Sequence, residues 1–146
     1  SRNLKIPIEI IPGIPSANAA GALLGAPLMH DYVVISLSDL LTPWGVIEKR
    51  VTLAAVGDFV IVLYNPRSAG RTWQLEKAVE IMLTHKSPDT IVGIVKSAMR
   101  KDQSVTVTKL SDLLRYPIDM TTIIIVGNST TFVFGSYMVT KRGYVV

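Results

Sequence analysis

Three short apolar segments limit most strongly how this chain can fold. Residues 59–64, 90–95 and 121–126 read FVIVLY, TIVGIV and TTIIIV. Each run is about as long as a typical strand, and none shows the alternation of polar and apolar residues that a half-exposed strand has. The runs therefore predict strands that are covered on both faces, which requires a layer of structure on each side of the sheet.

A helical pattern lies between the first two runs. In residues 73–84, Leu75, Ala78, Val79 and Met82 recur at the spacing of one helix face. A strand, a helix and a strand in succession favour a parallel pair with a right-handed crossover. We therefore predict an α/β fold, with a mostly parallel or mixed sheet flanked by helices.

The rest of the chain adds weaker elements to this plan. Further apolar or alternating stretches predict three more strands. A short helix should follow the last of these strands, and the tail should form an edge hairpin. The expected strands are residues 8–12, 32–37 and 104–110, the expected helices are 16–25, 43–56 and 111–115, and the hairpin is 132–144.

Length and composition indicate one domain with a missing neighbour. The chain has 146 residues, of which 49% are apolar, so part of its surface is expected to meet another domain or subunit. We predict that residues 1–28 are a remnant of an N-terminal domain with its linker, and that residues 29–146 form a C-terminal α/β domain. With no cysteine, no leader-like start and no apolar stretch of about 18 residues, a cytoplasmic protein outside the membrane is expected.

Polar residues follow each of the three apolar runs. Asn65 and Arg67 follow the first, Ser97 the second, and Asn128 and Ser129 the third. Ligands of open α/β sheets bind at the carboxyl ends of the strands, so these exits predict a shared cleft in which Arg67 contacts an anion. The alternative is that each exit is an ordinary turn, because asparagine, serine and proline favour turns.

Several other functions lose support from the sequence. The phosphate-binding, dinucleotide-binding, zinc-protease and serine-hydrolase motifs are missing, and neither His30 nor His85 stands in a catalytic pattern. The net charge of +4 suits an anionic partner, but scattered basic residues and 7% aromatics do not predict nucleic-acid binding.

Several segments together resemble the tetrapyrrole methylases. Residues 11–28, IPGIPSANAAGALLGAPL, resemble the family's P-G-x-T/S-A segment, and residues 121–127 resemble its last apolar strand. Residues 29–44, 62–68, 126–131 and 138–144 are similar to the branch that methylates C17 of precorrin-3. The resemblance implies two α/β domains, S-adenosylmethionine bound between them, and a cytoplasmic homodimer.

The resemblance also implies site residues. Matched positions assign the cofactor site to Pro15, Ser16, Tyr64, Asn65, Gly93 and Gly127, where Pro15 replaces the family's usual threonine or serine. The implied substrate contacts are Arg67, Asn128, Ser129 and Arg142, with Arg71 as a further anchor for the carboxylates of the macrocycle. No protein-bound metal is expected.

The implied reaction is methyl transfer to C17 of a precorrin-3 macrocycle with ring contraction, in which orientation is the main catalytic device. The family's glycine-rich loop and G-D-P segment do not occur in the chain. The isolated chain is therefore expected to bind S-adenosylmethionine weakly and to be inactive. Another methylase of the family, or a non-catalytic α/β module that binds a polyanion or a protein, remains an alternative, and the sequence does not decide whether the substrate carries cobalt.

Overall fold

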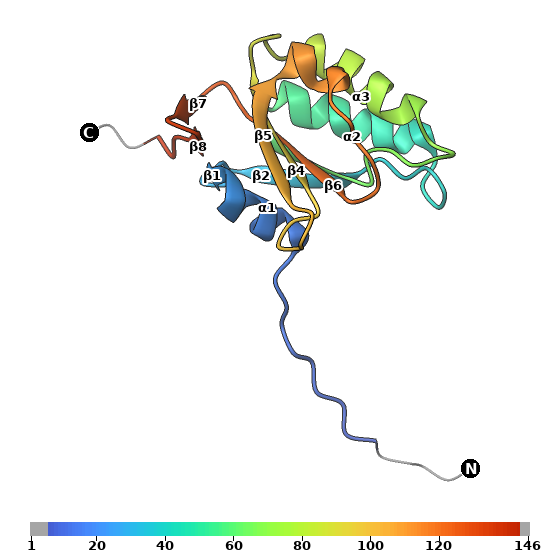
Figure 1. Ribbon diagram of the computed structural model, residues 1–146. Helices are drawn as coiled ribbons and strands as arrows, with labels where there is room; N and C mark the ends of the chain where they lie inside the picture. Colours follow the sequence, from blue (N-terminus) through green and yellow to red (C-terminus); the bar gives the residue numbers. More distant parts are fainter. Residues whose placement is uncertain (1–5, 144–146) are drawn as a thin grey trace.

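The computed structural model describes residues 6–143, and within them the chain forms two sheets (Figure 1). The larger sheet has the strand order β2-β3-β6-β4-β5, formed by Tyr32–Ser36, Val60–Tyr64, Thr122–Val126, Ile91–Lys96 and Ser104–Lys109. The smaller has the order β1-β8-β7, formed by Gly25–Ala26, Tyr137–Thr140 and Thr131–Phe134. The predicted α/β class with a mixed sheet is confirmed.

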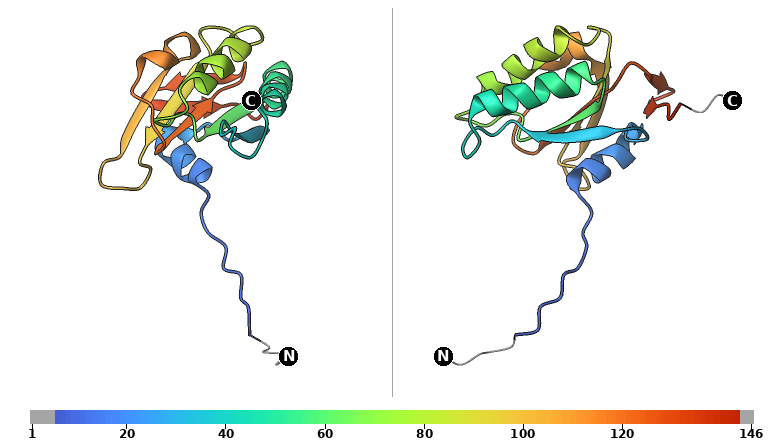
Figure 2. Two further views of the ribbon diagram at one scale, coloured as in Figure 1. Left: turned by 90° about the vertical axis from the view of Figure 1, so that its right-hand side faces the viewer. Right: turned by 180° about the vertical axis from the view of Figure 1, so that it is seen from behind.

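Helices cover both faces of the larger sheet. Helices α2 (Trp44–Val56) and α3 (Trp73–Leu83) pack on one face with the 3-10 helix η1 (Leu110–Arg115), and α1 (Ser16–Leu24) packs on the other (Figures 1 and 2). The predicted helix over residues 43–56 begins one residue later, because Pro43 has an extended ψ of 140° and acts as the N-cap.

The apolar runs divide their side chains between two cores. In β3, Ile61 and Leu63 belong to the core beneath α2 and α3, whereas Val60 and Val62 belong to the core beneath α1. Strand β6 follows the same rule with Ile124 on one side and Ile125 on the other. Successive side chains of a strand point to opposite faces, so an uninterrupted apolar run is what a doubly covered strand requires.

The strand pairing differs from the prediction at the centre of the sheet. Strands β3 and β4 were expected to pair in parallel, but β6 lies between them and pairs antiparallel with both. The parallel pair of the larger sheet is β2 with β3, joined through α2. Strand β6 is apolar on both faces and can therefore occupy the centre of a sheet that is covered on both sides.

Two predictions at the ends of the chain also need correction. Residues 8–12 form no strand, and the isoleucines of this segment are exposed, Ile8 by 86% and Ile10 by 90%. The tail forms a hairpin from β7 and β8, but in the smaller sheet and not at the edge of the larger one. Tyr144 of the predicted hairpin lies outside the described residues. None of the helices described between residues 6 and 143 is long and apolar enough to cross a membrane.

Candidate functional site

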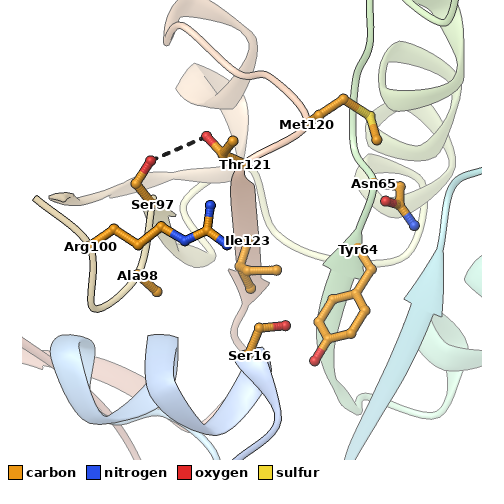
Figure 3. A pocket seen from close by; sticks show the side chains of 9 residues that line it. All are labelled: Ser16, Tyr64, Asn65, Ser97, Ala98, Arg100, Met120, Thr121 and Ile123. Atoms are coloured by element: carbon orange, nitrogen blue, oxygen red, sulfur yellow. Dashed lines mark hydrogen bonds between the residues drawn. The ribbon is translucent and has the colours of Figure 1, made fainter. Parts of the chain in front are cut away.

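A hollow of about 280 Å³ opens where β3 and β4 end and β6 begins, beside the first turn of α1 (Figure 3). It combines polar groups from separate parts of the chain with a few apolar side chains. The lining residues are Ser16, Tyr64, Asn65, Ser97, Ala98, Arg100, Met120, Thr121 and Ile123. Three of the predicted cofactor residues, Ser16, Tyr64 and Asn65, are therefore brought together.

Tyr64 is the last residue of β3 and ties the sheet to α1. Its hydroxyl accepts a hydrogen bond from the Ala17 N–H at 2.8 Å, and its ring packs against the core beneath α1. The Pro15 carbonyl accepts hydrogen bonds from the N–H groups of Asn18 and Ala19, which sets the start of the helix. Ser16 is thus held at the wall of the hollow, whereas Pro15 acts as the cap of α1.

Asn65 turns the chain sharply at the end of β3. Its φ is +50°, in the left-handed region that asparagine tolerates better than most residues. The Asn65 side chain donates to Ser36 Oγ at 3.0 Å, and the Asn65 backbone carbonyl accepts from the Arg71 guanidinium at 3.1 Å. These bonds hold the left-handed turn in place at the rim of the hollow.

Strand β4 ends in the same way. Ser97 has a φ of +49°, its N–H donates to the Thr121 carbonyl at 3.0 Å, and Met99 has a φ of +59°. Left-handed residues other than glycine store backbone strain, and such strain is common where a ligand binds. The two strands that flank β6 therefore both end in strained, hydrogen-bonded turns that face the same hollow.

An ion pair fixes the start of β6. Lys96 Nζ lies 2.6 Å from the Asp119 carboxylate, which also accepts a hydrogen bond from the Thr121 hydroxyl at 2.7 Å. The hydrogen bond from Lys96, followed by that from Thr121, holds the pKa of Asp119 well below its usual value. Asp119 thereby connects the end of β4 to the first residues of β6.

The predicted glycines lie away from the hollow. A Cβ on Gly93 would come within 2.4 Å of Leu24 Cδ1, so this glycine makes room for the helix α1 beneath the sheet. A Cβ on Gly127 would come within 2.6 Å of the Thr131 side chain. Neither glycine is among the residues that line the hollow.

Asn128 and Ser129 lie at the opposite end of the sheet, so the predicted clustering of all three polar exits is wrong. Strand β6 runs antiparallel to β3, and its end therefore lies beside the start of β3, where Val126 pairs with Ile61. Ser129 donates from its N–H to the Asp58 carboxylate at 3.0 Å, and the Asn128 side chain accepts from Thr130. Two of the predicted substrate contacts are thus in turns that bond internally.

A buried lysine completes this opposite end. Lys86, with a side chain only 3% exposed, donates to Asp58 at 3.3 Å and to the carbonyls of Phe59 and Gly127. Burial lowers the pKa of Lys86, and the charge of Asp58 opposes that shift only in part. Burial raises the pKa of Asp58, but the hydrogen bonds from Ser129 and the charge of Lys86 outweigh it and leave this pKa lowered.

The predicted arginine anchors occupy three different places. Arg67 donates to Glu76 at 3.0 Å, so its charge is already paired. Arg142 lines a separate hollow with His30 and Asp31, near the start of β3. Arg71 alone reaches the site, because its guanidinium bonds to Asn65 and to Met120 Sδ at 3.1 Å.

Arg100, Met120 and Thr121 line the hollow but were not predicted as site residues. Met120 precedes the third apolar run and Thr121 is its first residue, whereas ligand groups were expected only after the runs. Because β6 is antiparallel, its amino end meets the carboxyl ends of β3 and β4. Within residues 6–143, no group of three or more histidines and acidic residues is placed to hold a metal ion.

Known proteins share the sequence family and the fold of this chain. The model of the family Tetrapyrrole (Corrin/Porphyrin) Methylases matches residues 1–114. The chain is 52% identical over 143 residues to the "Probable cobalt-factor III C(17)-methyltransferase" of Salmonella typhimurium, covering 98% of this chain and 59% of that protein. It is also 52% identical over 139 residues to the "Cobalt-factor III methyltransferase" of Priestia megaterium, covering 95% of this chain and 26% of that protein.

A solved structure supports the same relationship. The crystal structure of the methyltransferase CobJ superposes with a TM-score of 0.86 at 36% identity, over 94% of this chain and 58% of that one. The chain thus spans only part of the length of the proteins that it matches. The family match over residues 1–114 and the 52% identity over 98% of the chain show that the chain belongs to the tetrapyrrole methylases.

Proposed function

We propose that the chain is the C-terminal part of an S-adenosylmethionine-dependent methyltransferase that methylates C17 of a precorrin-3-type tetrapyrrole in cobalamin biosynthesis. The observation that carries this proposal is the 52% identity, over 98% of the chain, to a probable cobalt-factor III C17-methyltransferase. Because such relatives are named for cobalt-factor III, the proposed substrate carries cobalt, as part of the macrocycle and not of the protein.

The proposed cofactor site is the hollow beside α1. Ser16, Tyr64 and Asn65 offer hydrogen-bonding groups there, and the apolar side chains of Ala98 and Ile123 offer a surface for a flat ring. A hollow of about 280 Å³ is smaller than most ligand sites, which often enclose 300 Å³ or more, and it opens on one side. We therefore infer that a preceding domain, joined through residues 6–15, supplies the other wall.

In this mechanism S-adenosylmethionine supplies an electrophilic methyl group to a carbon of the macrocycle. The contribution of this chain is orientation, since fixed geometry alone lowers the barrier of a two-reactant step substantially. The strained turns at Asn65 and Ser97 hold their positions through hydrogen bonds to Ser36 and Thr121. The site walls are thus set before a ligand arrives, and little ordering remains for the reaction itself.

The test is a methylation assay with a hybrid protein. The hybrid joins the part of the Salmonella relative that this chain does not match to the N-terminus of the chain. We expect the hybrid to add one methyl group from S-adenosylmethionine to the cobalt-factor III macrocycle, and the product's NMR spectrum to place that group at C17. The chain alone should be inactive and should bind S-adenosylhomocysteine weakly.

Other outcomes would change the proposal. Methylation at another carbon would assign the chain to a different reaction of the same family. A folded hybrid that binds neither S-adenosylhomocysteine nor a tetrapyrrole would favour a non-catalytic module instead. We also propose a cytoplasmic homodimer without nucleic-acid or membrane partners, and light scattering of the hybrid should give twice the mass of one chain.

A further inference from the structure

The loop between β4 and β5 has a fixed backbone although it lies at the surface. Ser97 and Met99 adopt left-handed φ angles of +49° and +59°. The Met99 N–H donates to Gln103 Oε1 at 2.9 Å, and the Arg100 N–H donates to the Ser97 carbonyl at 2.9 Å. This bonding stabilises a strained conformation that determines where the next side chain, that of Arg100, can reach.

The Arg100 side chain extends into the hollow from this loop. Figure 3 shows it reaching from the loop toward the middle of the hollow, on the side away from Tyr64 and Asn65. The residues that line the hollow include no aspartate or glutamate. The Asp119 carboxylate, which adjoins the lining through Thr121, is engaged by Lys96 and Thr121.

The charge of Arg100 is uncompensated within the described part of the chain. Six lysines and arginines there form ion pairs with aspartate or glutamate, namely Arg67, Lys77, Lys86, Lys96, Lys109 and Arg115. Arg100 forms none with any residue between 6 and 143, and Arg71 adds a second guanidinium at the rim through its bonds to Asn65 and Met120. The hollow therefore carries a net positive charge that an anion would neutralise.

We propose that Arg100 binds a carboxylate of the ligand that occupies this hollow. The inference rests on the proposed function and assigns a specificity-determining residue to its site. Guanidinium groups stay protonated at all relevant pH values and bind carboxylates through two parallel hydrogen bonds. The carboxylate comes either from the amino-acid part of the cofactor or from an acidic side chain of the tetrapyrrole.

The experiment measures binding by calorimetry to the hybrid protein described above. Three probes separate the sources: S-adenosylhomocysteine, 5′-methylthioadenosine, which lacks the carboxylate of the cofactor, and uroporphyrin, a tetrapyrrole with carboxylate side chains. The variants are Arg100→Met and Arg100→Lys. The matched control is Lys101→Met, which removes an exposed positive charge from the same loop but not from the hollow.

Loss of a charge-assisted hydrogen bond predicts that Arg100→Met weakens binding of one carboxylate-bearing probe about tenfold or more, while leaving 5′-methylthioadenosine unchanged. The affinity of Arg100→Lys for that probe should lie between those of the unchanged hybrid and Arg100→Met, because lysine keeps the charge but cannot form the two parallel hydrogen bonds. Lys101→Met should bind all three probes as the unchanged hybrid does. Selective weakening of S-adenosylhomocysteine identifies the cofactor as the source, and selective weakening of uroporphyrin identifies the tetrapyrrole.

Two results would overturn this inference and leave the proposed function intact. One is an Arg100→Met variant that binds every probe normally. The other is an equal loss for 5′-methylthioadenosine and the acidic probes, which would indicate a disturbed loop and no carboxylate contact. If the unchanged hybrid is folded yet binds none of the probes, then the proposed function itself fails, and that outcome is distinct from the other two.

Discussion

The two ends of the larger sheet use polar residues in opposite ways. At the end where β3 begins, which we call the self-bonded end, Lys86 and Ser129 donate to Asp58, and Lys86 also donates to the Gly127 carbonyl. A hollow of about 240 Å³ lies beside Asp58, but these polar groups are satisfied within the chain. At the other end, where β3 and β4 finish, the turns at Asn65 and Ser97 are equally well bonded. They surround a hollow that Arg100 also lines, and Arg100 has no ionic partner within the described residues. We call this the open end. The difference teaches that polar turns at strand ends do not by themselves indicate a ligand site, whereas a charged side chain that has no ionic partner beside a hollow favours one.

The substitution with the largest expected effect is Lys86→Met, at the self-bonded end. The substitution leaves the carbonyls of Phe59 and Gly127 and part of the Asp58 carboxylate without their buried donor, so we expect the free energy of unfolding to fall by about 3 kcal/mol. Urea unfolding measures this loss. The control Lys77→Met, which removes an exposed pair with Glu80, should leave the urea midpoint nearly unchanged.

The same variant also tests the separation of the two ends. At a temperature where it remains folded, the Lys86→Met hybrid should bind S-adenosylhomocysteine as the unchanged hybrid does. Weaker binding by a folded protein would show that the self-bonded end contributes to the ligand site.

Gly93→Ala is expected to have the next largest effect. The new Cβ would overlap Leu24, and overpacking of this kind costs about 2 kcal/mol of unfolding free energy. A Cβ on Gly45 of α2 meets no atom within 4 Å, so the control Gly45→Ala should leave stability equal or higher. If Gly93→Ala keeps its stability and instead loses ligand affinity, Gly93 belongs to the cofactor site as the resemblance implies.

A smaller effect is expected at Asn65. At its φ of +50° alanine is less tolerated than glycine, so Asn65→Ala should be less stable than Asn65→Gly by about 1 kcal/mol. Both variants lose the bond to Ser36, and the difference between their urea midpoints therefore isolates the backbone strain. Equal midpoints would mean that the left-handed turn stores no strain at the open end.

The smallest expected effect concerns acid stability. The pKa of Asp119 is lowered in the folded state, so its stabilising contribution is present above the unfolded value near 3.8 and is lost as the pH falls below it. Asp119→Asn and Lys96→Met should both reduce the difference between urea midpoints at pH 7 and pH 3. An unchanged difference in both variants would show that the ion pair does not stabilise the start of β6.

Local sequence patterns predicted most of the elements because local contacts decide them. The runs at residues 59–64, 90–95 and 121–126 appear as the three central strands, and the pattern at 73–84 appears as α3. Residues 8–12 failed for a related reason, since an apolar segment becomes a strand only when a partner strand pairs with it, and the described residues provide none.

Strand order was not predictable from local patterns. The runs at β4 and β6 look alike, and nothing in either sequence says which one pairs with β3. Because of this ambiguity, Asn128 and Ser129 were predicted at the wrong end of the sheet, and Met120 and Thr121 were not predicted as part of the candidate site. Arg100 was missed because its side chain reaches the hollow through a loop conformation set by Ser97 and Met99.

The most direct test of the central claim is an NMR titration of S-adenosylhomocysteine into the hybrid, with the amide nitrogens of this chain labelled. The difference between the two ends predicts shifts at the amides of Tyr64, Asn65, Ser97 and Thr121, with little change at Asp58 and from Asn128 to Thr131. Shifts concentrated around Asp58 and Ser129 instead would contradict the assignment of the open end as the ligand site.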